Sequence, residues 1–130
     1  MMKGNSGYCR RGSTEPDMTL NDVVKEFDLK VKAGAGLLGR EVAGGYVSDL
    51  LSDVLAHAED GVLWVTLHIH QNIVGVASHK GLAGIVLVQG RVPENDTVAK
   101  AEEEQIPIMV TDLSAFEFVG RLYKAGIRGA

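Results

Sequence analysis

Apolar residues recur along the chain at two different spacings, and from about residue 62 onward these spacings alternate. Residues 62–67 and 83–88 are nearly continuous runs of strand-forming apolar residues, which are typical of strands covered on both faces. Between them, Ile73, Val76 and Ala77 follow helical spacing. Such alternation predicts parallel strands joined by helical crossovers. We therefore expect a single-domain α/β protein with a mostly parallel sheet and flanking helices.

The region before residue 62 carries shorter patterns of the same two kinds. Thr19 stands three residues before Asp22, as in a capping box, at the start of a helical apolar stripe. Apolar residues then alternate with Lys30 and Lys32, which predicts a half-exposed strand. We expect helices over 20–27, 49–57, 72–80, 94–105 and from Ser114 to Gly126, and strands over 29–32, 41–47, 62–67, 83–88 and 108–111. The stripes expected to face the core include Leu50, Leu51, Val54 and Leu55 in the second helix and Phe118, Val119, Leu122 and Tyr123 in the last.

A glycine-rich stretch at 34–39 matches the dinucleotide-binding pattern G-x-G-x-x-G. That pattern binds a pyrophosphate when a strand precedes the glycines and a helix N-terminus follows them. Here the glycines precede the strand pattern of residues 41–47, so a flexible loop is the better interpretation. Within that strand, Gly44 and Gly45 predict a bulge or the close approach of another backbone.

Composition and charge narrow the classes of function. The formal net charge is −4 with no basic run, which argues against a nucleic-acid polymer or an anionic membrane as partner. No apolar run approaches the roughly 18 residues that span a bilayer. The single cysteine, Cys9, excludes a disulfide framework within the chain and indicates a reducing, cytoplasmic compartment. Residues 1–17 are poor in large apolar groups, so we expect a disordered N-terminal extension before a domain over 18–127.

The histidines that follow the predicted strand over 62–67 are candidate metal ligands. His68 and His70 would project to one face of an extended backbone, and His79 would add a third nitrogen for a metal-dependent hydrolase. No carboxylate at a diagnostic spacing supports such a centre. The alternative is that this segment, where a parallel strand passes into a helix N-terminus, receives an anionic ligand through its backbone N–H groups.

Motifs of catalysis are missing elsewhere in the sequence. No serine lies in G-x-S-x-G, and no G-x-x-x-x-G-K-[ST] loop is present. Asp49 and Asp53 are expected on the solvated face of a helix. These observations favour a protein that is not an enzyme and uses no cofactor.

Residues 40–53 resemble the DRTGG domain family. The similar residues are Arg-Glu-Val-Ala-Gly-Gly followed by Tyr-Val-Ser-Asp-Leu-Leu-Ser-Asp, with Gly39 in place of the family's aspartate. The blocks at 63–66, 70–73 and 83–86 are also similar to stand-alone DRTGG proteins. The resemblance extends over about residues 18–127. It implies the fold of the N-terminal domain of HPr kinase/phosphorylase and, more distantly, of the N-terminal domain of muramyl-peptide ligases.

The resemblance also implies a function. Related domains occur in regulatory proteins, which points to a non-catalytic module that senses a nucleotide or phosphorylated small molecule and forms a homodimer. Some stand-alone members are labelled hydrogenase-related, which implies the alternative of an accessory partner in a larger redox or transferase complex. We expect the ligand-binding residues to meet in one crevice at a sheet end: Arg40, Gly44, Gly45, Ser48, His68, His70 and Asn72.

Overall fold

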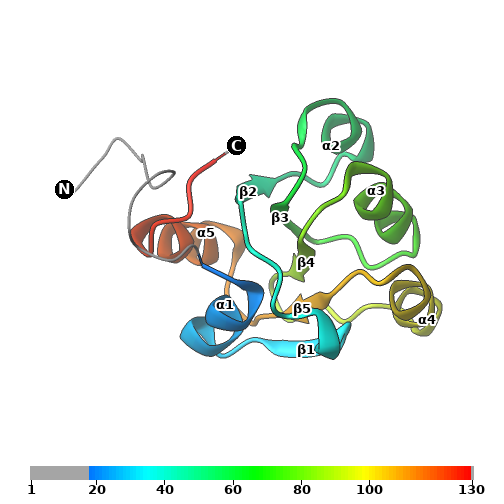
Figure 1. The fold of residues 1–130 in the computed structure, drawn as a ribbon, viewed down its shortest axis with the longest axis horizontal. Helices are drawn as coiled ribbons and strands as arrows, with labels where there is room; N and C mark the ends of the chain where they lie inside the picture. The colour runs from blue at the N-terminus through cyan, green and yellow to red at the C-terminus, as the bar shows by residue number, and fades with distance from the viewer. Residues whose placement is uncertain (1–17, 130) are drawn as a thin grey trace.

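Five strands and five α-helices make up the fold of residues 18–129, which are the residues that the computed structural model describes (Figure 1). The predicted N-terminal extension, residues 1–17, lies outside the described residues. The strands are β1 (Lys30–Ala33), β2 (Gly44–Val47), β3 (Val62–Thr66), β4 (Gly84–Leu87) and β5 (Ile108–Val110). The helices are α1 (Leu20–Phe27), α2 (Leu51–His57), α3 (Asn72–Lys80), α4 (Asn95–Glu104) and α5 (Ala115–Lys124), with a 3-10 turn, η1, at Ala35–Leu37.

The strands form one sheet in the order β1-β5-β4-β3-β2. Strands β2, β3, β4 and β5 are parallel to their neighbours, whereas β1 pairs antiparallel with β5 at one edge. The prediction of a single α/β domain with a mostly parallel sheet is therefore confirmed. Each predicted helix is present within a few residues of its expected bounds.

Helices cover both faces of this sheet because alternate side chains of the central strands point to opposite faces. Trp64 and Ile85 pack in one cluster with residues of α2, α3 and α4. Leu63 and Val86 pack in the other cluster with residues of α1 and α5. Figure 1 shows the same division, with α2, α3 and α4 on one side of the strands and α1 and α5 on the other.

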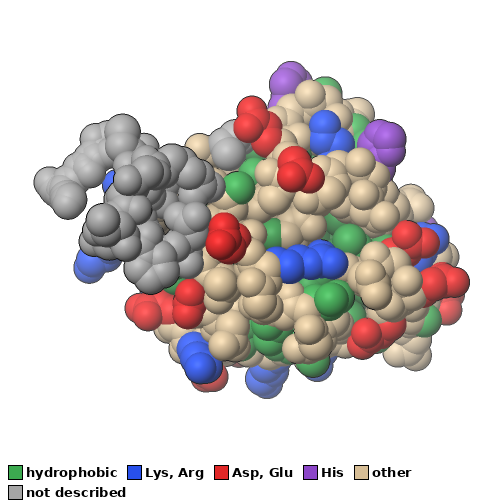
Figure 2. All heavy atoms as spheres, viewed as in Figure 1, with side chains coloured by type: hydrophobic (Ala, Val, Ile, Leu, Met, Phe, Trp, Pro, Cys, Tyr) green, Lys and Arg blue, Asp and Glu red, His purple; other side chains and the backbone are tan. Residues whose placement is uncertain are grey.

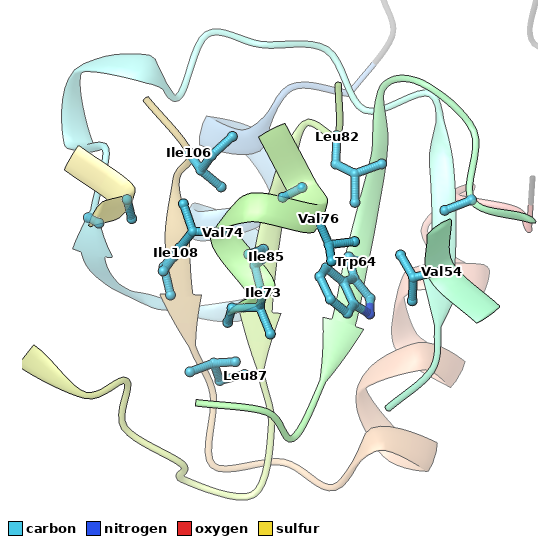
Figure 3. Packing of buried hydrophobic residues seen from close by; sticks show 14 of the residues in the cluster. Val54, Trp64, Ile73, Val74, Val76, Leu82, Ile85, Leu87, Ile106 and Ile108 are labelled. Carbon is cyan, nitrogen blue, oxygen red and sulfur yellow. The ribbon is translucent and has the colours of Figure 1, made fainter. Parts of the chain in front are cut away.

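Trp64 is the largest fully buried side chain of the first cluster. In Figure 3 its ring lies between Val54 of α2 and Val76 of α3. Its indole nitrogen donates a 2.9 Å hydrogen bond to the backbone oxygen of Ser48, directly after β2. A buried indole N–H requires such a partner. Trp64 therefore fixes the end of β2 as well as filling the core.

The glycine pair begins β2 and is regularly paired, so the predicted strand over 41–47 is too long. Of the two predicted alternatives for the glycines, the structure has the close approach of another backbone, at Arg128, and not a bulge. Gly44 and Gly45 pair in register with Val62 and Leu63. The residues before them are engaged elsewhere. Glu41 forms an isolated antiparallel bridge with Thr19 ahead of α1, and this competing partner keeps the segment out of the sheet.

Three apolar side chains expected in the core are exposed instead. Leu50 is 64% exposed, Leu55 is 42% exposed and Tyr123 is 56% exposed. The predicted stripes on α2 and α5 are therefore wider than the parts that the sheet covers, and the core face of α5 is supplied by Phe118 and Leu122.

Charged side chains of both signs are interspersed over the face shown in Figure 2, and acidic groups gather around α4. This face has no broad basic area. Among residues 18–129, no helix has the length and apolar character needed to cross a bilayer.

Gly34 provides a test of how the glycine-rich stretch is built. Its φ is +74°, and a Cβ there would lie 2.7 Å from the Cα of Pro107. We expect Gly34→Ala to lower the free energy of unfolding by at least about 2 kcal/mol, because both the left-handed backbone and the backbone contact exclude a side chain. Gly36→Ala is the matched control, since its Cβ would meet nothing within 4 Å. Equal stabilities of the two variants in urea unfolding would contradict this account.

Candidate functional site

The predicted ligand-binding residues lie at opposite ends of the parallel strands, so they do not form one crevice. Gly44 and Gly45 begin β2, whereas Ser48 follows its last residue. Four residues of extended chain span about 13 Å. The structure therefore does not bring the two sets of residues together in one crevice.

At the amino end of the parallel strands, Arg40 and Gly45 donate hydrogen bonds to backbone carbonyl oxygens of other segments. The guanidinium of Arg40 donates a 2.8 Å hydrogen bond from Nη2 to the carbonyl oxygen of Gln105, the C-cap of α4. A cation is favourable at a helix C-terminus. The N–H of Gly45 donates to the carbonyl oxygen of Arg128, and a Cβ on Gly45 would lie 3.7 Å from a methyl carbon of Ile127. The C-terminal segment thus lies against the start of β2, with ordinary contact distances at Gly45.

At the carboxyl end, Asp49 connects the β2–α2 turn to the end of β3. Its Oδ1 accepts hydrogen bonds from Thr66 Oγ1 at 2.7 Å and from the Leu67 N–H at 2.8 Å. The Nε2 of His68 contacts the backbone oxygen of Asp49. Asp49 is exposed, as predicted, but it precedes α2 and its carboxylate is hydrogen-bonded within the protein. Asp49, Thr66 and His68 satisfy one another's polar groups, and we call these three residues the Asp49 bridge.

Asp53 lies on α2 with its side chain 33% exposed, and its carboxylate is also hydrogen-bonded. Its carboxylate accepts a 2.9 Å hydrogen bond from the Tyr46 hydroxyl and lies 3.0 Å from Nδ1 of His57. Hydrogen bonds from Ser48 and then Tyr46 lower the pKa of Asp53, with a smaller contribution from His57. Partial burial and the bond to Asp53 raise the pKa of Tyr46.

This group has the wrong connectivity for a nucleophilic relay. In a serine-histidine-aspartate triad the imidazole touches the hydroxyl and the carboxylate orients the imidazole. Here the carboxylate of Asp53 is the shared acceptor, and the Ser48 hydroxyl also accepts a 3.1 Å hydrogen bond from the Leu50 N–H. The arrangement holds the turn after β2 rather than activating a hydroxyl.

Helix α3 separates His70 from His79. His70 precedes this helix, and its Nδ1 accepts a 3.1 Å hydrogen bond from the Asn72 N–H, so it caps the first turn. His79 lies in the last turn, about 13 Å along the helix axis from His70. Within the described part of the chain, no three His, Cys, Asp or Glu residues are grouped so as to hold a metal ion. Asn72 itself lines a different surface hollow, between α2 and α3.

A second region of the carboxyl edge is open. The connection after β4 leads to α4 on one face of the sheet, whereas the connection after the adjacent β5 leads to α5 on the other face. Where neighbouring connections diverge in this way, open α/β sheets form a ligand-binding crevice. A hollow of about 390 Å³ lies there, and we call it the switch-point crevice.

Both connections and the edge strand contribute polar groups to the switch-point crevice. Its polar lining consists of Asp28, Lys30, Lys32, Gly90, Thr111 and Asp112. The side chains of Lys30 and Lys32 are exposed, and neither ammonium group has an ion-pair or hydrogen-bond partner among residues 18–129. Gly90 adopts a left-handed φ of +68°, and a Cβ there would lie 3.1 Å from Oδ1 of Asp112.

The sequence prediction missed these crevice residues. The alternation of Lys30 and Lys32 with apolar residues was a correct signal for a strand, but it carried no information on the strand's neighbour. Only the antiparallel pairing of β1 with β5 brings Lys30 beside Val110 at the carboxyl end of β5, with Lys32 two residues further along β1.

Comparison with known proteins supports the fold. No protein-family model matches the sequence, and no curated protein matches it significantly. The fold is similar to the crystal structure of the CBS and DRTGG domains of the regulatory region of Clostridium perfringens pyrophosphatase, complexed with the activator diadenosine tetraphosphate. The TM-score is 0.63 at 11% sequence identity, over 85% of this chain and 47% of that chain. This chain thus spans about half the length of that structure. It has a DRTGG-like α/β fold, as the sequence resemblance implied.

The Asp49 bridge can be tested with a double-mutant cycle. We expect Asp49→Ala to lower the free energy of unfolding by about 1 to 3 kcal/mol, because two donors lose a charged acceptor. Combined with Thr66→Val, the losses should be non-additive by at least about 0.5 kcal/mol. Asp112→Ala is the control, because Asp112 is exposed and has no hydrogen-bond partner within 18–129. An additive cycle, or an equal loss in the control, would refute the bridge.

The hydrogen bonds to Asp53 predict a pH dependence of stability. The folded-state pKa of Asp53 is lower than its usual value of 3.8. Its contribution to stability is therefore fully present above the unfolded-state pKa and is lost as the pH falls through the folded-state pKa. We expect the stability difference between wild type and Asp53→Asn to shrink as the pH is lowered below about 4. Ser52→Ala, an exposed and uncharged position on the same helix, should give a difference that does not change over this range.

Proposed function

We propose that the protein is a non-catalytic regulatory module that senses a nucleotide or other phosphorylated small molecule and self-associates as a homodimer. The observation that carries the sensing part is the switch-point crevice with its two unpaired lysines. The crevice lies at the carboxyl ends of the parallel strands, where α/β folds bind ligands. At the neighbouring strand ends the polar groups are already paired with one another in the Asp49 bridge. We place this module in the cytoplasm, as the single cysteine suggests.

The size of the crevice favours a small ligand. Its volume of about 390 Å³ is near the lower end of the roughly 300–1,000 Å³ typical of ligand pockets. A single nucleoside phosphate fits this range better than a whole dinucleotide.

The mixture of charges favours a nucleotide over a bare anion. Lys30 and Lys32 offer ammonium groups to phosphate oxygens. Asp28 and Asp112 line the same hollow, and carboxylates accept hydrogen bonds from hydroxyl or amino groups. A ribose or a base supplies such donors, whereas inorganic pyrophosphate would bring only negative charge toward the two carboxylates.

The comparison with a solved structure is compatible with this proposal. The similar structure is a regulatory region, and it was solved in complex with a nucleotide activator. The connectivity around Asp53 supports a role other than catalysis. The self-association part is supported by the family resemblance and by apolar side chains exposed on α5.

Calorimetric titration with ADP tests the sensing part. We expect binding that weakens about tenfold in Lys30→Gln and in Lys32→Gln, because each removes one charge-assisted contact with phosphate. Added salt should also weaken binding. Lys80→Gln is the control, since Lys80 ends α3 at the opposite edge of the sheet and should leave the affinity unchanged.

Three further ligands, AMP, diadenosine tetraphosphate and pyrophosphate, separate the possible outcomes. Pyrophosphate should bind more weakly than ADP if Asp28 and Asp112 recognise hydroxyl or amino groups. Unchanged ADP affinity in both lysine variants would place the ligand elsewhere and overturn the crevice as the site. If ADP, AMP, diadenosine tetraphosphate and pyrophosphate all fail to bind at millimolar concentration, the sensing function itself is refuted.

A further inference from the structure

Helix α5 has two apolar faces, although the sheet covers only one of them. Phe118 and Leu122 are buried against the strands. On the outer side, Phe116 is 91% exposed and Tyr123 is 56% exposed. A helix that is apolar on two sides is expected where both sides are covered. In the described part of the chain, the Arg128 guanidinium lies over the Tyr123 ring, 4.0 Å from its centre, whereas Phe116 is left uncovered.

The outer apolar residues follow a regular helical spacing. Phe116, Val119, Gly120 and Tyr123 are separated by three, one and three residues, so they form one stripe about 10 Å long. With Ala115 and Val47 of the edge strand β2, they line an apolar groove of about 580 Å³. We call this surface the α5 groove. Gly120 forms its floor, since a Cβ there would meet nothing within 4 Å.

We propose that a second copy of this chain covers the α5 groove, with the two α5 helices packed antiparallel about a two-fold axis that passes between the levels of Phe116 and Gly120. This proposal rests on the self-association part of the proposed function and names its surface. The groove has both a projection, the ring of Phe116, and a hollow above Gly120. A two-fold axis lets each ring enter the hollow of the other copy, as an isologous interface requires. Glycine at the crossing point permits close approach of the two helices.

The charges on α5 match this antiparallel arrangement. Glu117 lies in the first turn, and Arg121 and Lys124 lie in the last. Within one copy Glu117 and Arg121 form an exposed pair at 3.3 Å. Antiparallel packing brings the acidic first turn of each helix toward the basic last turn of the other, and it also opposes the helix dipoles favourably. A parallel arrangement would place like charges together.

Strand pairing across β2 is a less suitable way to join two copies. The Gly45 N–H already donates to the carbonyl oxygen of Arg128, and Gly45 forms a parallel bridge with Gly129. The C-terminal segment therefore occupies the start of this edge, which blunts it as a template for another strand. The exposed apolar surface therefore favours a dimer formed by side-chain packing between two α5 helices.

Cross-linking tests the predicted axis. In a Cys9→Ser background, Gly120→Cys places one thiol on each copy beside the axis. We expect a short bismaleimide to join most of this variant into covalent dimers at concentrations where wild type sediments as a dimer. Ser52→Cys is the control, because Ser52 is exposed on α2, away from the groove. Cross-linking of the two variants to an equal extent would contradict the proposal.

Sedimentation of charge variants tests the contact itself. Phe116→Glu should shift the dimer dissociation constant upward at least about tenfold, because two buried rings are replaced by carboxylates. Folding should be unaffected, since Phe116 is 91% exposed. Leu55→Glu adds the same charge at an exposed apolar position on α2 and should leave the constant unchanged.

The outcomes distinguish this interface from the broader function. A wild-type protein that remains monomeric up to about 1 mM refutes self-association altogether, and with it a second copy as the occupant of the groove. A stable dimer that Phe116→Glu does not weaken leaves self-association standing but overturns the α5 groove as its surface. Neither result bears on nucleotide binding at the switch-point crevice, which the lysine variants test separately.

Discussion

The complete burial of the two central strands is the constraint on which the rest of the structure depends. Every side chain of β3 and β4 is inaccessible or nearly so, which requires a helical layer on each face of the sheet. Three consecutive crossovers place α2, α3 and α4 on one face, so α5 must cross to the other face together with α1. The diverging connections after β4 and β5 follow from this requirement. The switch-point crevice is thus a consequence of how the core is covered.

The two halves of the carboxyl edge differ because their polar groups have different partners. Around β2 and β3 the Asp49 bridge and the bonds to Asp53 use carboxylates, hydroxyls and a histidine within the protein. Around β5 the lysines of β1 face solvent without partners in the described part of the chain. Polar groups that already satisfy one another gain little from a ligand, whereas an unpaired ammonium gains a charge-assisted bond. This contrast, more than residue type, separates structural from binding positions.

The second half of the fold was predictable from sequence because its signals are local. Apolar periodicity located β3, α3, β4, α4 and β5, and the alternation of these elements implied a parallel sheet. The first half was less accessible because its pairing is not local. The strand pattern of Glu41 and Val42 was real, yet these residues pair with Met18 and Thr19 ahead of α1 rather than with β3. The exposure of Leu50, Leu55 and Tyr123 likewise depended on how far each helix extends beyond the sheet. The spacing of apolar residues does not show how much of each helix the sheet covers.

The candidate site was harder to predict than the fold because a site joins segments that are distant in sequence. Two glycines serve backbone packing instead of ligand binding. Gly45, in the stretch that carries the family resemblance, donates its N–H to the carbonyl oxygen of Arg128, and Gly34, in the earlier glycine-rich stretch, lies against Pro107. The proposed ligand site instead combines β1 with the connections after β4 and β5. The β5–α5 connection, residues 111–114, also leads directly into the helix that forms the α5 groove. A ligand in the crevice and a second copy on α5 would therefore both act on one segment. Since coupling between two binding events is reciprocal, a ligand that tightens the dimer must itself bind more tightly to the dimer, by the same factor.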